Sequence, residues 1–393
     1  MTSRLLIAFL FLLVSHLNLH AQKLVFPVDT FPVIDTMMGM VDTNIFLGNV
    51  HHLQDYGTRE CFSPEAIQAQ NWLKDIFESY SLSVELQDFL VWIWDPSDNV
   101  IATFPGKVTP DEYVILGAHY DSYTGGPFAP GADDNASGTA GVLEVARILT
   151  QYQFEKTIIF CAFSAEEYGL FGSEAYAARC EQEGMNILGY INMDMIGYHA
   201  PGQVLHSDMI APPSAQELAQ FYINVAAIYL PGFPIYNGSL TGGDSDHTSF
   251  NNHGYMGIFP FEDDEFHSPY IHTDEDTIGP SLNSAELALH LMRAGLASVV
   301  TLAIPYTPVG IEPVSCPESI VYIFPNPAHS KIQISLKSEE NISIQLHNLT
   351  GKLVFQDHFT HHTILNVGQL PRGAYSLTLK SSTFQVVRKV ILQ

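Results

Sequence analysis

The chain has 393 residues, of which 46% are hydrophobic, enough for a large core and a second, smaller domain. Its 42 Asp and Glu residues outnumber its 16 Lys and Arg residues, and the formal net charge is −26. This balance argues against nucleic-acid binding, which requires a basic face. It favours solubility and would attract a cationic peptide amino terminus.

Residues 1–21 predict an export signal. Arg4 supplies the basic start, an apolar run covers residues 5–14, and Ala21 offers a cleavage point. The apolar run is too short to span a bilayer as a mature helix. No later stretch is expected to be long and apolar enough for a transmembrane anchor.

Residues 22–304 are expected to form one α/β unit. Ser63 followed by Pro64 predicts the start of its first helix, and residues 140–149 and 284–304 predict later helices. Three strongly apolar runs predict strands that are covered on both faces. We therefore expect a mixed, largely parallel central sheet with helices on both faces. The predicted strands are 84–91, 100–104, 113–118, 157–164 and 188–193.

Acidic and histidine residues follow the apolar runs. Glu166 and Glu167 stand side by side after one run, where two carboxylates repel each other and lose hydration. A metal ion would compensate for that cost. His119 ends a second run, and Asp194 follows a third. Ligands of open α/β sheets bind at the carboxyl ends of strands, so these positions predict a metal site.

Five motifs in this order resemble the co-catalytic zinc aminopeptidase family. The family also includes glutaminyl cyclases and the non-enzymatic ectodomain of the transferrin receptor. The similarity runs from about residue 50 to residue 302. The motifs are His119-Tyr-Asp121, Gly131-Ala-Asp-Asp134-Asn-Ala-Ser-Gly138, Glu166-Glu167-Tyr-Gly169-Leu-Phe-Gly172-Ser173, Asn192-Met-Asp194-Met-Ile-Gly197 and His272-Thr-Asp-Glu-Asp276-Thr277.

The resemblance implies two zinc ions roughly 3.5 Å apart. Asp134 would bridge them, His119 and Asp194 would complete one site, and Glu167 and His272 would complete the other. Zinc accepts His nitrogen and carboxylate oxygen and leaves a position open for water in catalytic sites.

The resemblance also implies roles for two further carboxylates. Glu166 would be the general base that takes a proton from the metal-bound water. Asp121 would orient His119, because a carboxylate beside a ligating imidazole accepts the second ring N–H.

Three other polar positions are interpreted more cautiously. Asp133 is expected to be structural, because its turn favours a small or acidic residue. His247 lies in a segment expected beside the site, outside the set of ligands. The acidic run 263–265 is expected to be a solvated loop, with calcium binding or attraction of a substrate amine as alternatives.

The four cysteines leave the redox state open. Cys161 lies in a predicted buried strand and is expected to be a packed thiol, and Cys316 lies in a Pro-rich stretch. Cys61 and Cys180 could pair in an oxidising compartment, but sequence alone does not fix the connectivity.

The last part of the chain differs in pattern. Residues 305–317 contain four prolines and predict a semi-rigid linker. Residues 318–393 contain short alternating strands, which predict a small β-sandwich. Its motifs resemble the C-terminal sorting domain of type IX secretion substrates. These motifs are Tyr322-Ile-Phe-Pro-Asn-Pro-Ala328, Leu349-Thr-Gly-Lys352, Leu370-Pro-Arg-Gly-Ala-Tyr375 and Lys389-Val-Ile-Leu-Gln393.

That resemblance implies passage through the periplasm, contact with an outer-membrane secretion machinery, and a secreted or cell-surface product. A carbohydrate-binding or generic sandwich domain is the alternative, but no cluster of exposed aromatic residues supports sugar binding.

The combined expectation is an exported di-zinc aminopeptidase that acts on peptides with a free amino terminus. A glutaminyl cyclase of the same fold would work with one zinc ion. A catalytically silent ectodomain would lack ligands or the base, and this chain keeps all of them. A carboxypeptidase for acidic dipeptides would require clustered arginines, and only three arginines lie between residues 100 and 300.

Overall fold

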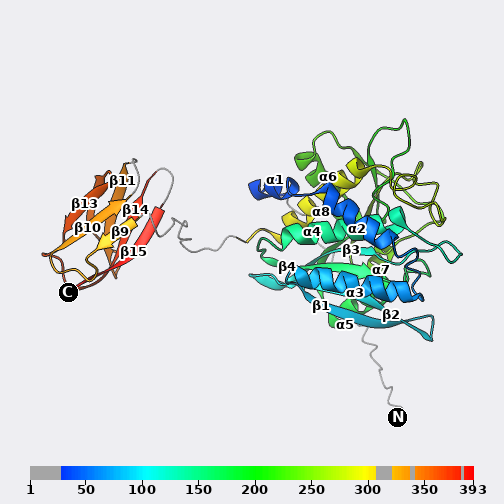
Figure 1. Cartoon of the computed structure of the whole chain (residues 1–393), viewed down its shortest axis with the longest axis horizontal. Helices are drawn as coiled ribbons and strands as arrows, with labels where there is room; N and C mark the ends of the chain where they lie inside the picture. Colours follow the sequence, from blue (N-terminus) through cyan, green and yellow to red (C-terminus); the bar gives the residue numbers. More distant parts are fainter. Residues whose placement is uncertain (1–27, 307–320, 337–340, 382–384) are drawn as a thin grey trace, which may run out of the picture. The chain divides into compact units, whose positions relative to one another are not determined.

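The computed structural model describes residues 28–306, 321–336, 341–381 and 385–393 (Figure 1). The chain divides into two compact units, residues 1–307 and residues 308–393. The predicted export signal and all but two residues of the predicted linker lie outside the described residues. The predicted limits of the α/β unit, residues 22–304, and of the β-sandwich, residues 318–393, remain predictions.

The first unit is built on an eight-stranded sheet with the order β1-β2-β4-β3-β5-β8-β6-β7. The pairs β3/β4, β3/β5, β5/β8 and β6/β7 are parallel, whereas β1/β2, β2/β4 and β6/β8 are antiparallel. The predicted mixed, largely parallel sheet is therefore confirmed. The strands are β1 Ser83–Val91, β2 Asp95–Phe104, β3 Thr109–His119, β4 Lys156–Phe163, β5 Asn186–Asn192, β6 Ser207–Ile210, β7 Ile235–Asn237 and β8 Gly257–Phe261.

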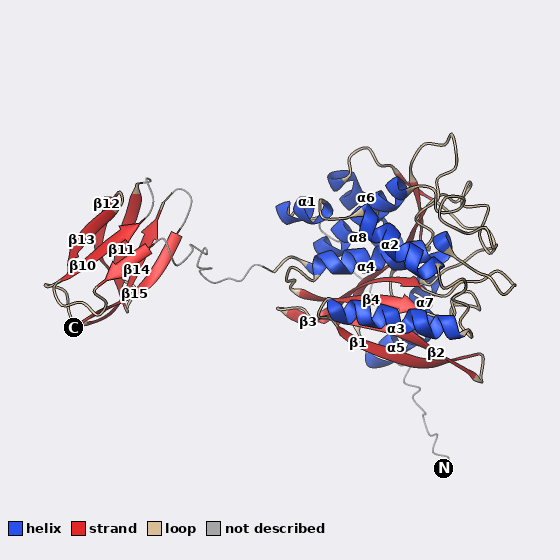
Figure 2. Ribbon diagram, viewed as in Figure 1, coloured by secondary structure: helices blue, strands red, loops and turns tan. Residues whose placement is uncertain are grey.

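Helices cover both faces of the sheet (Figure 2). Alternate residues of the strands face two different cores, as the period of two in a strand requires. One core includes residues of α1, α2, α3, α4, α6 and α8, and the other includes residues of α5 and α7. The helices are α1 Pro32–Met38, α2 Thr43–Gln54, α3 Pro64–Ser79, α4 Gly138–Leu149, α5 Phe171–Glu183, α6 Gln216–Tyr229, α7 His247–Asn252 and α8 Ala285–Ala303.

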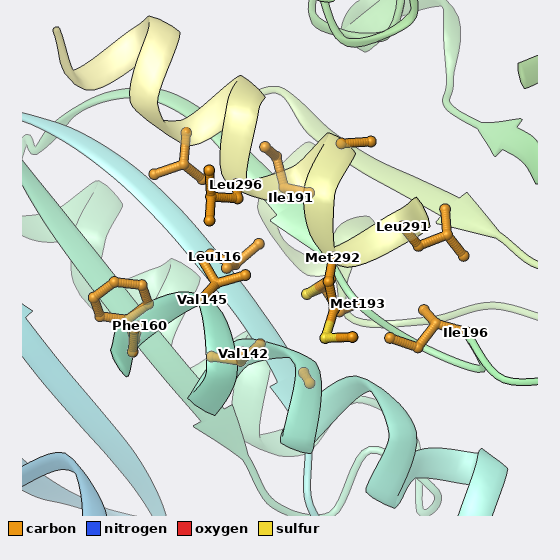
Figure 3. Packing of buried hydrophobic residues seen from close by; sticks show 14 of the residues in the cluster. Leu116, Val142, Val145, Phe160, Ile191, Met193, Ile196, Leu291, Met292 and Leu296 are labelled. Atoms are coloured by element: carbon orange, nitrogen blue, oxygen red, sulfur yellow. The ribbon is translucent and has the colours of Figure 1, made fainter. Parts of the chain in front are cut away.

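Helix α8 crosses the centre of the larger core. Its Leu291 and Leu296 lie with Leu116 of β3, Val142 of α4 and Ile191 of β5 (Figure 3). This helix is long and apolar enough to cross a membrane, so the expectation that no later stretch would qualify is wrong. Because 72% of its most apolar window is buried, the hydrophobicity is explained by packing inside this unit.

Local sequence signals account for several element ends. Ser63 caps α3 by accepting a hydrogen bond from the Ala66 amide at 3.0 Å, as predicted. Ser284 caps α8 in the same way through the Leu287 amide. Strand β2 begins earlier than predicted, at Asp95, because it forms a hairpin with β1.

The described cysteines are free thiols. Cys61 and Cys180 belong to separate hydrophobic clusters, so the disulfide considered for them is not formed. Cys161 packs in the same cluster as Cys180, as a buried strand residue should. Cys316 lies outside the described residues.

The second unit is the predicted β-sandwich. It has a three-stranded sheet, β13-β10-β9, and a four-stranded sheet, β12-β11-β14-β15. Alternate residues of both sheets, such as Ile334 and Leu377, form one shared core. The strands are β9 Val321–Phe324, β10 Lys331–Leu336, β11 Ile342–Asn348, β12 Leu353–Phe359, β13 His362–Asn366, β14 Gly373–Lys380 and β15 Gln385–Leu392.

Candidate metal centre

Three neighbouring parallel strands bring the predicted ligands to one edge of the sheet. Strands β4, β3 and β5 are adjacent, and their carboxyl ends point the same way. His119 is the last residue of β3, Glu167 follows β4, and Asp194 follows β5. Asp134 lies in the turn before α4, and His272 lies in the loop between β8 and α8. All five predicted ligands therefore meet in one place.

Asp134 lies between two groups of donor atoms. Its Oδ1 is 3.4 Å from His119 Nε2, and its Oδ2 is 3.3 Å from His272 Nε2. His119 Nε2 is also 3.4 Å from Asp194 Oδ1, and His272 Nε2 is 2.8 Å from Glu167 Oε2. In each group of three, the donor atoms lie within 4.8 Å of one another. The two oxygens of the Asp134 carboxylate thus belong to two different triads of candidate ligands, and Asp134 is the member that the triads share.

The donor chemistry fits metal binding. Asp194 Oδ1 and Glu167 Oε1 are buried and accept no hydrogen bond. An unsatisfied buried carboxylate oxygen is costly unless a cation is present. One His nitrogen and carboxylate oxygens in each triad are ligands that zinc accepts. These residues could therefore hold two metal ions that share Asp134.

Asp121 contacts both motifs that follow β3 and β4. Its Oδ1 lies 3.4 Å from His119 Nδ1. The same carboxylate accepts hydrogen bonds from the amides of Glu166 at 3.2 Å and Glu167 at 3.4 Å. The side chain is fully buried. Asp121 therefore holds the Glu166–Glu167 loop and lies beside the His119 ring.

Two residues outside the predicted set hold the Asp134 turn. The Asp276 carboxylate accepts hydrogen bonds from the amides of Asp133 and Asp134 at 2.9 and 3.0 Å. The buried Arg59 guanidinium donates to the carbonyl oxygens of Pro130 and Gly131 at 2.7 and 2.8 Å. Both partners fix the backbone of the turn, so they position the side chain of Asp134.

Gly138 allows this turn to approach β5. A Cβ atom at Gly138 would lie 1.9 Å from the carbonyl oxygen of Met193, which is a severe clash. Only glycine permits this contact. The glycine at the end of the Asp134 motif is therefore a packing requirement.

A chain of buried hydrogen bonds fixes Asp194. Ser245 Oγ donates to Asp194 Oδ2 at 2.6 Å, and Asn192 Nδ2 donates to Ser245 Oγ at 2.7 Å. The Tyr190 hydroxyl donates to Asn192 Oδ1 at 2.7 Å. The sequence placed the Ser245 segment beside the site but did not indicate this role.

Glu166 lies beside the two triads without belonging to either. It lines a pocket of about 700 Å³ together with Asp134, Glu167, Asp194 and His272. Burial raises the pKa of Glu166 well above its ordinary value, and the neighbouring Glu167 carboxylate raises it further. A raised pKa in a cleft is typical of a group that exchanges protons.

The predictions for Asp133, His247 and residues 263–265 have different outcomes. Asp133 is buried and accepts a hydrogen bond from the Gly197 amide at 2.9 Å, as a structural residue would. His247 is buried and belongs to none of the candidate ligand groups among the described residues. The solvated loop expected at 263–265 is found only in part, because Glu265 is exposed whereas Asp263 is only 7% exposed and Asp264 lines the pocket.

Comparisons with known proteins agree with this geometry. Residues 99–294 match Peptidase family M28, and residues 322–393 match the Secretion system C-terminal sorting domain. A protein of Pyrenophora teres f. teres named "Probable zinc metalloprotease" is 31% identical over 192 residues, 42% of this chain and 41% of its own length. A "Probable leucine aminopeptidase" of Trichophyton verrucosum is 28% identical over 68% of this chain and 77% of its own.

Two solved structures share the fold. Legionella pneumophila LapA aminopeptidase has a TM-score of 0.65 and 23% identity over 72% of this chain and 78% of its own. Bacteroides thetaiotaomicron glutaminyl cyclase has a TM-score of 0.57 and 21% identity over 66% of this chain and 98% of its own. This chain spans about two fifths of the length of the curated zinc metalloproteases that it matches. The chain contains a peptidase family M28 domain, matched over residues 99–294, and a secretion system C-terminal sorting domain, matched over residues 322–393.

Proposed function

We propose that this chain is a zinc aminopeptidase that removes the first residue from peptides with a free amino terminus. The observation that carries the proposal is the sharing of Asp134 by two ligand triads, with Glu166 left free beside them. Paired metal sites beside a free carboxylate suit hydrolysis in which the metals activate water and the carboxylate moves its proton. A one-zinc cyclase would not require the second triad.

The zinc ions, Glu166 and Asp121 would have different roles in the reaction. When bound, the two zinc ions supply Lewis-acid activation of the scissile carbonyl and of water. The Glu166 carboxylate accepts the proton of the attacking water and gives it to the leaving amine. Asp121 holds the loop from which Glu166 acts.

The pocket indicates which first residue is accepted. Its apolar lining comes from Met195, Leu240, Phe259, Phe261 and Ile271, which also pack as one hydrophobic cluster. An apolar side chain of the substrate would gain from burial there. The nearby carboxylates of Asp244 and Asp264 would attract the substrate's amino group.

The test is a substrate panel. We expect hydrolysis of leucyl- and methionyl-p-nitroanilide, slower hydrolysis of aspartyl- and lysyl-p-nitroanilide, and none of the N-acetylated compounds. Chelation should abolish the activity. Cyclisation of N-terminal glutamine without release of p-nitroaniline would contradict the peptidase assignment and favour the cyclase.

We also propose that residues 318–393 are an address for type IX secretion, as a sorting domain implies. Passage through the periplasm and contact with an outer-membrane machinery follow from this assignment. The product would be secreted or held at the cell surface.

Removal of the second unit should leave the chemistry intact, because each unit has its own hydrophobic core. A chain ending after Tyr306 keeps the hydrogen bond from the Tyr306 amide to the Gln153 carbonyl at 2.8 Å. We expect its kcat/KM to equal that of the full chain, while export by a type IX-competent host is lost. A folded truncated protein without activity would contradict a pure sorting role.

A further inference from the structure

We propose that His206, Asp208 and Asp263 bind a third zinc ion next to Asp264, a residue that lines the substrate pocket. Among the described residues, they form the one candidate ligand group that shares no member with the Asp134 centre. The proposal goes beyond the aminopeptidase assignment and does not depend on it.

The three residues come from two paired strands. His206 precedes β6, Asp208 lies in β6, and Asp263 follows β8, which is antiparallel to β6. His206 Nε2 is 3.4 Å from Asp208 Oδ2 and 3.7 Å from Asp263 Oδ2. The donor atoms lie within 4.8 Å of one another, which leaves space for an ion between them.

The histidine is oriented as a ligand. His206 Nδ1 lies 2.8 Å from the Val204 carbonyl oxygen, which can only accept a hydrogen bond. In the neutral ring Nδ1 therefore carries the proton, and the lone pair of Nε2 faces the two carboxylates. A backbone carbonyl behind the imidazole is a usual arrangement in metal sites, where it fixes the tautomer.

Both carboxylates are buried and held in place. Asp208 is 5% exposed, and its Oδ2 accepts a hydrogen bond from the Asp264 amide at 2.9 Å. Asp263 is 7% exposed, and its Oδ1 accepts hydrogen bonds from the amides of Glu265 and Phe266. Asp263 Oδ2 lies 3.7 Å from His206 Nε2, too far for a direct hydrogen bond, although Asp263 belongs to the same candidate ligand group. An ion between these atoms would supply the contact that the two side chains do not make directly.

The types of ligand favour zinc over calcium. One imidazole nitrogen and two carboxylate oxygens, with a position for water, form a set that zinc accepts. Calcium prefers six to eight oxygen ligands, so the histidine argues against calcium.

The site would brace the pocket. The Asp264 carboxylate accepts a hydrogen bond from the Ser239 amide at 2.7 Å, and both residues line the pocket. The Asp264 amide in turn is bonded to Asp208. A zinc ion on Asp208 and Asp263 would thus tie β6 and the loop after β8 to the wall that faces the substrate.

The test counts zinc ions in the full-length protein by elemental analysis after dialysis. We expect about three per chain in the wild type and about two in Asp263→Asn and His206→Ala. Asp263→Asn is the sharper variant, because the asparagine Oδ1 can still accept both amide hydrogen bonds. Zinc added to chelated protein should raise the Tm of the wild type more than that of either variant.

His253→Ala is the matched control. The His253 ring also lies between two carboxylates, but its two nitrogens are hydrogen-bonded to Glu181 at 2.6 Å and Glu174 at 2.8 Å. Both nitrogens then act as donors, and this position should leave the zinc count unchanged. Circular dichroism of the chelated proteins should show that all variants fold alike.

His272→Ala separates this proposal from the proposed function. It should remove one zinc from the Asp134 centre and leave the third site filled. A wild-type count of two that Asp263→Asn and His206→Ala do not lower would overturn the third site. A count that falls in Asp263→Asn but not in His272→Ala would uphold it and count against the two-metal centre.

Discussion

Replacement of Glu166 by glutamine is expected to lower kcat by about 10²–10⁴ and to leave KM nearly unchanged. The amide keeps the size of the side chain but cannot accept the proton of the attacking water. Glu166 belongs to neither triad around Asp134, so zinc binding at that centre should persist. Steady-state kinetics with leucyl-p-nitroanilide and elemental analysis of the same protein sample measure both effects.

Glu167→Gln provides the comparison, because it is the same change one residue along the chain. Glu167 Oε2 lies 2.8 Å from His272 Nε2, within the second triad. A neutral amide is a weaker zinc ligand, so this variant should lose about one zinc ion and regain part of its activity in added zinc. Loss of zinc from Glu166→Gln with full retention in Glu167→Gln would mean that the two roles are exchanged.

The sequence was sufficient for strands β1 to β5 and for the meeting of ligands at their carboxyl edge, whereas β6, β7 and β8 were not predicted. Apolar runs that end in His119, Glu167 or Asp194 predict buried parallel strands, and such strands share a carboxyl edge. Ser63 and Ser284 mark helix starts through purely local hydrogen bonds. Features that depend on neighbours along the chain were therefore predictable.

Contacts between distant segments were not predictable in this way. Arg59 donates to carbonyl groups more than 60 residues away, and Ser245 reaches Asp194 from 51 residues away. His206 had no motif to distinguish it, and its partner Asp263 stood in a run that resembled a solvated loop. The sequence contains one weak indication of the contact between Ser245 and Asp194, because Ser245 belongs to a Gly- and Asp-rich segment that was expected beside the site.

The fold explains two sequence patterns differently from composition alone. The length and composition of α8 suit a membrane span, but its neighbours are the strands and helices of the larger core. Cys61 and Cys180 are compatible with a disulfide by compartment alone, and the fold places them in different clusters. Composition restricts such possibilities, and packing decides between them.

Arg59→Met is expected to lower the free energy of unfolding of the first unit by about 3–5 kcal/mol, because it removes a buried charged donor from several backbone carbonyls. The side chain is fully buried and donates to the carbonyl oxygens of Leu53, Tyr120, Pro130 and Gly131 at 2.7–3.0 Å. Methionine fills part of the volume but donates to none of these carbonyls, and those of Leu53 and Gly131 keep only their backbone donors. Urea unfolding followed by tryptophan fluorescence measures the loss.

Arg179→Met is the control, because Arg179 is a half-buried surface residue that pairs with Glu85 at 2.6 Å. Such a pair contributes about 1 kcal/mol or less. Arg59→Lys separates charge from geometry, since an ammonium keeps the charge but lacks the planar fork that serves several carbonyls at once. We expect lysine to restore only a minor part of the stability, and zinc to bind Arg59→Met more weakly because the Asp134 turn loses its support. If Arg59→Met were as stable as Arg179→Met, or if lysine restored the full stability, the carbonyl network would not be what holds the Asp134 turn in place.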